Sequence, residues 1–240
     1  MFAAIFAAVG CTIGTHGAVV SLVPTLDNSI YSESDNSNAL GGLFTGRTAG
    51  GAIRRALLEF DIAASIPAGA TIDSVVLTLS QIKIGPAGSA LFELHPVLSA
   101  WGEGTSSGSG SGGTATPGDA TWNSRLFGTA TWTTAGGDFS TAVATTNFGT
   151  SIGTYSFTST LGMVSNVQSW LNSPSTNFGW LIKTDNESLV SARELGSGES
   201  APAEQPKLTV TYTVPEPGTA GLLGVAAIFA VSRRARSPKK

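Results

Sequence analysis

Two stretches of this sequence alternate apolar and polar residues with a period of two, the pattern of a β-strand that buries one face. In residues 54–62 (RRALLEFDI), one face carries Ala56, Leu58, Phe60 and Ile62. Residues 71–84 (TIDSVVLTLSQIKI) repeat the alternation, and the turn-forming SIPAGA of residues 65–70 separates the two stretches. Such strands pair in a sheet and bury their apolar face, so we expect a fold built mainly from β-strands.

Shorter stretches extend this pattern along the chain. Two further strands are expected within residues 18–31, with a turn between them at Asp27 and Asn28. The remaining strands are expected near residues 43–46 and at 90–97, 151–157, 177–183, 190–195 and 207–214. The chain has 30 glycines in 240 residues and only 12% charged residues, which suits an exported all-β domain with many turns.

Residues 160–172 follow a helical spacing instead. The apolar residues that recur with the helical period are Leu161, Val164, Val167, Trp170 and Leu171. Ser159 or Thr160 is placed to cap the first turn. We therefore expect one short amphipathic helix, with Trp170 buried against the edge of the sheet.

The C-terminal residues 214–240 have three parts in a fixed order. Residues 214–218 (VPEPG) are turn-prone, and residues 219–231 are apolar and uncharged. The cations that follow are Arg233, Arg234, Arg236, Lys239 and Lys240. Apolar residues followed by cations stop a chain in a membrane with the cations on the cytoplasmic side, so we expect a transmembrane run. The alternative is a helix packed on the domain, but such a helix would show polar residues at a 3.6-residue period.

Residues 1–18 (MFAAIFAAVGCTIGTHGA) form an apolar run followed by small residues, as in a secretory signal peptide, although no cation precedes the run. Cleavage is expected after Gly17 or Ala18. A lipoprotein signal ending at Cys11 is an alternative, but the leucine expected three residues before the cysteine is missing. Cys11 is the chain's single cysteine, so a mature body of residues 19–213 would have no disulfide.

Charge is divided unevenly between the body and the tail. Five of the 13 Lys and Arg lie in the tail, so residues 19–213 carry eight cations against 15 Asp and Glu. An acidic body disfavours a partner with a phosphate backbone, and we expect no nucleic-acid binding.

The residues available for catalysis form no known arrangement. His95 lies in an expected strand, where a lone histidine is usually a packed or surface residue. Glu59 and Asp61 share one strand face, where they do not flank a glycosidic bond, and we expect them to pair with Arg54, Arg55 or other surface groups. The sequence shows no Ser–His–Asp order, nucleotide loop or zinc spacing, so we expect no enzyme.

Tryptophans near loops are the candidate binding residues. Sugar rings stack on flat indole faces, and neighbouring polar groups bind the sugar hydroxyls. The candidate carbohydrate-binding residues are Trp101, Glu103, Trp122 and Arg125. The alternative, that Trp101 and Trp122 fill the end of the sandwich, stays open, and for Trp132, Trp170 and Trp180 we favour such a packing role. A sugar-binding module predicts an exposed tryptophan beside polar groups, whereas a spacer domain predicts five buried ones.

Carboxylates in the expected loops are candidate ligands for a structural calcium ion. These residues are Asp27, Asp119 and Asp138. Their spacing matches no defined calcium loop, so the sequence does not predict how they would meet.

The tail resembles the PEP-CTERM sorting signal. The resemblance rests on Pro215, Glu216 and Pro217, the apolar run after them, and the basic residues Arg233, Arg234 and Arg236. It implies a protein exported by a Gram-negative bacterium that makes exopolysaccharide, held in the inner membrane by its tail, and processed near the tripeptide by an exosortase.

The body resembles the DNRLRE-type domain, a family of alginate-binding modules, over roughly residues 18–213. The matching segments include RALLEFDI, SIPAGATIDSVVLTL, ELHPVLSAWGEGT and the closing PKLTVTY. This resemblance implies an antiparallel β-sandwich of jelly-roll type and no catalysis.

The expected organisation is a signal peptide (residues 1–18), a β-sandwich (19–213) and a sorting tail (214–240). The expected function is that of a non-catalytic cell-surface or extracellular-matrix protein that contacts polysaccharide, with an acidic one such as alginate as the candidate ligand. A structural or adhesive surface protein without sugar binding is the alternative, and a polysaccharide lyase comes third.

Overall fold

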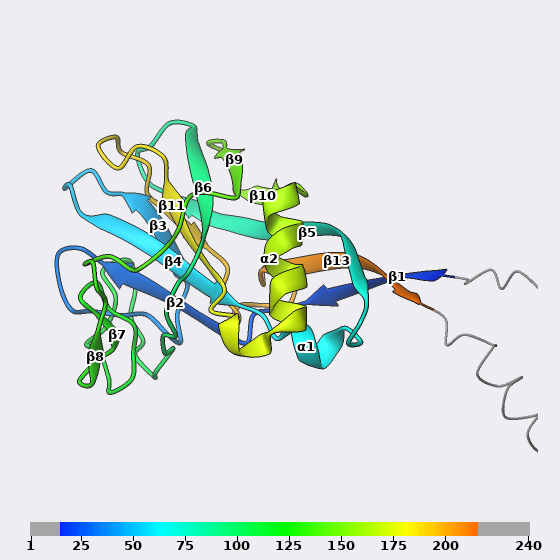
Figure 1. Ribbon diagram of the computed structural model, residues 1–240. Helices are drawn as coiled ribbons and strands as arrows, with labels where there is room; N and C mark the ends of the chain where they lie inside the picture. The colour runs from blue at the N-terminus through cyan, green and yellow to red at the C-terminus, as the bar shows by residue number, and fades with distance from the viewer. Residues whose placement is uncertain (1–14, 216–240) are drawn as a thin grey trace, which may run out of the picture.

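The computed structural model describes residues 15–215, which form two antiparallel β-sheets packed face to face with one amphipathic helix against them (Figure 1). The expected all-β antiparallel sandwich with a short amphipathic helix is confirmed. Residues 1–14 of the predicted signal peptide and residues 216–240 of the predicted tail lie outside the described residues.

The first sheet is organised around its longest strand, β5. Strand β5 pairs with β13 and β12 along one edge and with β10 along the other, and β1 pairs with β13. Its strands are β1 (Thr15–Leu22), β5 (Thr71–Ile84), β10 (Gly153–Phe157), β12 (Arg193–Leu195) and β13 (Lys207–Pro215).

The second sheet has the strand order β2–β4–β11–β6–β9. Its strands are β2 (Leu26–Tyr31), β4 (Ile53–Glu59), β6 (Ala90–Pro96), β9 (Ala144–Phe148) and β11 (Trp180–Thr184). Strand β3 (Leu43–Arg47) pairs with β12 and, through its last two residues, with β4. It therefore joins the two sheets into one curled sheet.

The main core lies between the two sheets. The alternation of β4 sends Ala56 and Leu58 into this core, as expected, and both are fully buried. Helix α2 (Leu161–Asn172) packs on the same core through Met163, Val167, Trp170 and Leu171. Its first turn is capped by Thr160, whose Oγ1 accepts the Met163 N–H at 3.1 Å. Leu161, expected on the buried face, is 90% exposed because it stands at the first position of the helix.

A second apolar cluster covers the outer face of the β2–β9 sheet. It is formed under the long connection between β6 and β9, residues 97–143, which we call the loop layer. Its buried members are Ile30, Leu57, Val97, Trp101, Ala120, Trp132 and Leu181. The loop layer contains the short strands β7 (Ser124–Leu126) and β8 (Ala130–Thr131). The second sheet is consequently buried on both faces.

The glycine- and serine-rich residues 102–118 of the loop layer are partly fixed by hydrogen bonds to the rest of the domain. Ser106 is buried, and its carbonyl accepts the Leu40 N–H at 2.9 Å. Gly113 and Ser37 exchange two backbone hydrogen bonds of 2.8 and 3.0 Å. This segment therefore forms part of the packed layer.

Two expectations for the second sheet are wrong. Asp27 and Asn28 lie inside β2, opposite Leu58 and Leu57, and form no turn. Hydrogen bonding explains why a strand tolerates a buried amide here: Asn28 Oδ1 accepts the Asn38 N–H at 2.9 Å and a second bond from a serine hydroxyl.

The expected ion pairs of β4 are also different. Arg54 binds Glu33 and Arg55 binds Glu187, each at 2.8 Å, whereas Glu59 and Asp61 pair with neither arginine. Asp61 instead caps a short helix that the sequence did not predict, α1 (Ile62–Ser65), by accepting the Ala64 N–H. A single 3-10 turn, η1 (Pro174–Thr176), follows α2.

The two ends of the described chain pair with each other. Thr15 stands opposite Pro215 and Leu22 opposite Leu208, so the β1–β13 ladder runs across both expected domain boundaries, at residues 18 and 213. Both ends leave the sandwich on the side away from β7 and β8 (Figure 1). Within residues 15–215, no helix is long and apolar enough to cross a membrane.

Candidate functional site

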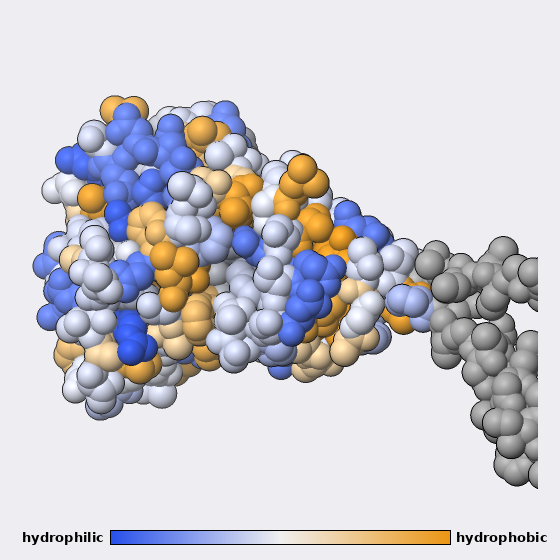
Figure 2. All heavy atoms as spheres, in the orientation of Figure 1, coloured by the Kyte–Doolittle hydropathy of each residue, from blue (hydrophilic) through white to orange (hydrophobic). Residues whose placement is uncertain are grey.

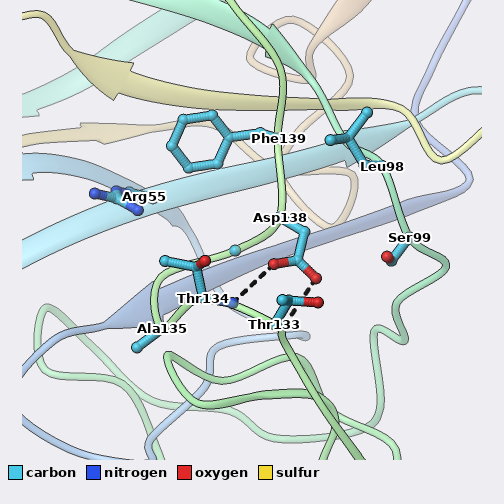
Figure 3. A pocket seen from close by; sticks show the side chains of 9 residues that line it. Arg55, Leu98, Ser99, Thr133, Thr134, Ala135, Asp138 and Phe139 are labelled. Carbon is cyan, nitrogen blue, oxygen red and sulfur yellow. Dashed lines mark hydrogen bonds between the residues drawn. The ribbon is translucent and has the colours of Figure 1, made fainter.

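A hollow in the described surface lies between the loop layer and β4. It has a volume of about 500 Å³. Two stretches of the loop layer form its walls, Leu98 with Ser99 and residues 133–139, and Arg55 contributes from β4 (Figure 3). Hollows of this size between loops on a rigid sheet are typical positions for small-molecule and sugar binding.

Arg55 is held firmly at one side of this hollow. Its guanidinium makes two hydrogen bonds of 2.8 Å to the Glu187 carboxylate and donates to the Gly136 carbonyl at 2.7 Å. It also stacks on Trp122, with the guanidinium carbon 4.7 Å from the ring centroid, and on Phe139, at 5.3 Å. Arg55 therefore acts mainly as a support that fixes the shape of the wall.

Gly136 makes this close packing feasible. Its φ of +91° lies in the left-handed region, and a Cβ there would stand 2.9 Å from the Trp122 ring and overlap Arg55. The turn beside it is fixed by Asp138, whose two oxygens accept the N–H groups of Thr133 and Thr134 at 2.9 Å each (Figure 3).

The lining combines the groups that recognise carbohydrate. The hydroxyls of Ser99, Thr133 and Thr134 are hydrogen-bond partners for sugar hydroxyls, and Phe139 and the 57% exposed Leu98 supply apolar surface. On the face drawn in Figure 2, apolar and polar residues are interspersed. The chemistry available at the hollow is reversible binding of a polar ligand that has an apolar face.

None of the five tryptophans lines the hollow, and four of them are buried. Trp122 is half-buried beside Arg55. Trp101 is 5% exposed, and its Nε1 donates to the Phe178 carbonyl at 2.9 Å. A buried indole cannot stack on a sugar, so Trp101 belongs to the packing under the loop layer. The remaining three, Trp132, Trp170 and Trp180, are buried, as favoured from the sequence.

The other two carbohydrate candidates do not line the hollow. Arg125 donates to the Ala100 carbonyl at 2.9 Å and so braces the loop layer. Glu103 accepts the Asp27 N–H at 2.8 Å through Oε1, and its own carbonyl accepts the Asn28 side-chain amide. Glu103 thus joins the loop layer to β2.

The three aspartates proposed as calcium ligands do not meet. Asp138 belongs to the hollow, whereas Asp27 lies next to Glu103 and to Glu199, which the sequence analysis did not single out. Asp119 is fully buried near Glu103 and accepts the Thr116 N–H. Glu199 lies in an irregular connection 172 positions after Asp27, and no sequence pattern signals that the two approach each other.

Burial and like charges shift the acidities of this carboxylate group. Burial raises the pKa of Asp27 to about 8, against the opposing effect of the Gly198 hydrogen bond, and the Glu199 and Glu103 carboxylates add to the rise. Burial also raises the pKa of Glu103, with Glu199 and Asp119 contributing. These carboxylates repel one another.

His95 is a packed residue of β6. Its Nδ1 lies 2.7 Å from the Ser140 carbonyl and its Nε2 lies 3.1 Å from Glu93. Although burial acts the other way, hydrogen bonds from Lys183 and His95 hold the pKa of Glu93 below its usual range. The contacts with the Ser140 carbonyl and Glu93 thus hold the imidazole in place.

A second, smaller hollow of about 270 Å³ contains Glu59 and Asp61. Burial raises the pKa of Glu59 to about 7, and the Asp61 carboxylate adds to the rise. The ionised form is therefore less favourable in the folded protein than in the unfolded chain. Below the pKa that Glu59 has in the unfolded chain, Glu59 is protonated in both the folded and the unfolded state, and the folded protein has its full stability. Part of this stability is lost as the pH rises through about 7, where Glu59 ionises in the folded protein.

Replacing Glu59 with glutamine is expected to remove this loss. At about pH 8 the Glu59→Gln variant should be more stable than wild type by about 1 kcal/mol, a value reduced from the full pKa shift because the side chain is partly solvated. At about pH 4 the two should unfold alike. Urea denaturation at both pH values measures this difference. The exposed Asp73→Asn is the control, and an equal gain for Glu59→Gln at both pH values would contradict the prediction.

No family model matches this chain, and no curated protein matches it.

Proposed function

We propose that this protein is an exported, non-catalytic β-sandwich that contacts polysaccharide through the hollow of the loop layer. The observation that carries the proposal is the lining of this hollow, which combines three hydroxyl residues with a phenyl ring and an exposed leucine. The hollow is built on a sheet whose two faces are both packed, so the site is preorganised.

The charge of the hollow favours a neutral or weakly charged sugar over a strongly acidic one. Arg55 is the single cation of the lining, and its guanidinium is already paired with Glu187. Asp138 adds a negative charge, and both oxygens of its carboxylate already accept hydrogen bonds from backbone N–H groups. An acidic chain such as alginate would find no unpaired cation among the lining residues.

Export and sorting rest on the two ends of the sequence. The apolar N-terminal run and the tail with Pro215, Glu216 and Pro217 support passage across the inner membrane, a stage anchored there by the tail, and processing by an exosortase. The protein would then work at the cell surface or in the extracellular matrix of a Gram-negative bacterium. In this proposal it belongs with PEP-CTERM proteins that carry a DNRLRE-type sandwich.

The test is affinity electrophoresis of the full-length chain, in mild detergent, through gels that contain neutral or acidic polysaccharides. Ala135 lines the hollow and is exposed, so Ala135→Trp should fill the site without disturbing the fold. We expect retardation in at least one neutral polysaccharide and about tenfold weaker binding for Ala135→Trp, equivalent to about 1.4 kcal/mol.

Ala201→Trp is the matched control, because Ala201 is equally exposed but lies in the connection between β12 and β13. It should bind as wild type does. If the folded chain is retarded by no polysaccharide, the carbohydrate proposal fails. The second candidate, a structural or adhesive surface protein, is then favoured by the burial of four of the five tryptophans.

A further inference from the structure

Three carboxylates from separate parts of the chain meet beside β2. Asp27 lies in β2, Glu103 in the loop layer, and Glu199 in the connection between β12 and β13. Each offers one oxygen, and these oxygens lie within 4.8 Å of one another. Oxygens that bind a calcium ion at about 2.3–2.6 Å stand up to about 5 Å apart across the ion, so the three fit one ligand shell.

The buried carboxylate of this group is half satisfied. Asp27 is 1% exposed, and its Oδ2 accepts the Gly198 N–H at 2.6 Å. Its other oxygen, Oδ1, is buried and receives no hydrogen bond from any residue in the described range. A buried carboxylate oxygen without a partner is costly to a fold. Its environment therefore points to a ligand that residues 15–215 do not supply.

Glu103 and Asp119 show the same pattern. Glu103 uses Oε1 to accept the Asp27 N–H. The nearby Asp119 is fully buried with an Oδ1 that also has no partner within residues 15–215. In each buried or half-buried carboxylate, backbone N–H groups fix one oxygen and leave the other available.

No cation of the described chain offsets these charges. The ion pairs within residues 15–215 involve Glu33, Glu93, Glu187 and Glu194, and none reaches the carboxylates beside β2. When all three carboxylates are ionised, their charges repel at this separation, and a divalent cation among them reverses the sign of the interaction.

We propose that Asp27, Glu103 and Glu199 bind a calcium ion, with Asp119 adding negative charge behind Glu103. Ligands that are all carboxylate oxygens suit calcium better than a transition metal. Calcium also accepts the irregular geometry of ligands from a strand and two loops, whereas magnesium requires a near-ideal octahedron. The ion would tie the loop layer to β2 and to the residues that precede β13. This site is separate from the sugar hollow and does not depend on the function proposed for it.

The test compares the full-length chain, stripped with a chelator, in calcium and in magnesium. Calorimetric titration with calcium chloride should show one site with a Kd of about 0.1–1 mM, as in extracellular modules. With a Kd of about 0.1 mM, a concentration of about 10 mM calcium should raise the Tm by about 5–10 °C. An equal response to magnesium would overturn the assignment to calcium.

Variants locate the site. Glu199 is exposed, so Glu199→Gln should fold normally and bind calcium about tenfold more weakly or worse. Glu204→Gln is the matched control, because Glu204 is exposed in the same connection but lies outside the cluster. A folded wild-type chain without heat of binding and without a Tm rise in calcium would overturn the proposal, as would unchanged affinity in the double variant Glu103→Gln/Glu199→Gln.

Discussion

Replacing Trp180 with alanine is expected to lower the free energy of unfolding by about 3–5 kcal/mol, the range for a large aromatic residue deleted from a core. Trp180 is fully buried in β11. Its ring packs edge-on against Trp170, with centroids 4.6 Å apart, and against Phe60, at 6.4 Å. It thus joins the second sheet to α2 and to the end of β4, and alanine would leave a cavity where three elements meet.

Urea denaturation followed by circular dichroism measures this loss, since the fluorescence of the variant changes with the tryptophan itself. The corresponding fall in Tm for a domain of this size is about 6–20 °C. The control is Trp180→Phe, which keeps a ring but loses the 3.0 Å hydrogen bond from Nε1 to Asn166, and should cost clearly less. A loss below about 1 kcal/mol in Trp180→Ala would show that the core closes around the gap.

The second large effect is expected at Gly179, which precedes β11. Its φ is +68°, and a Cβ there would overlap the carbonyl oxygen of Leu58 and stand 2.8 Å from the Glu59 Cα. The obstacle is backbone of β4, which cannot turn aside as a side chain can. Gly179→Ala should therefore cost about 2–5 kcal/mol, from left-handed strain of about 1–2 kcal/mol and overpacking of about 1–3 kcal/mol.

A second glycine separates these two causes. Gly69 has a φ of +83°, and a Cβ there would meet nothing within 4 Å. Gly69→Ala therefore reports the backbone strain alone, about 1–2 kcal/mol by chemical denaturation. Equal losses for the two variants would mean that the strand adjusts to the added methyl group and that the close approach of Gly179 to β4 is not needed.

Local sequence patterns predicted the central strands and the main helix. The alternation in residues 54–62 and 71–84 identifies β4 and β5, and the 3.6-residue spacing with Thr160 identifies α2 and its cap. These features depend on neighbours in the sequence, so the sequence contains the information needed to find them.

The second apolar cluster was missed although one residue signals it. Leu57 lies on the face of β4 that also carries Arg55 and Glu59, and an apolar side chain on a polar face suggests a second covering. What covers it is the loop layer, whose glycine- and serine-rich composition resembles that of an exposed loop. The burial of Trp101 follows from this packing and not from its local sequence.

The carboxylate cluster could not be predicted from spacing. Gly198 and Asp27, which share a hydrogen bond, are 171 positions apart, and the β1–β13 and β13–β5 ladders bring them together. The turn expected at Asp27 and Asn28 was wrong for a related reason: buried partners elsewhere in the chain satisfy the Asn28 side chain and outweigh its turn propensity.

The pairing of β1 with β13 also decides how the sandwich would carry force. When polysaccharide holds the loop layer and the C-terminal end of the sandwich is tethered, tension enters β13 along its own axis. The backbone bonds that join β13 to β1 and β5 lie across this axis over residues 207–215. Such a pull loads all the hydrogen bonds of the ladder together instead of breaking them one after another. Mechanical strength would thus be greatest along the line between tether and ligand.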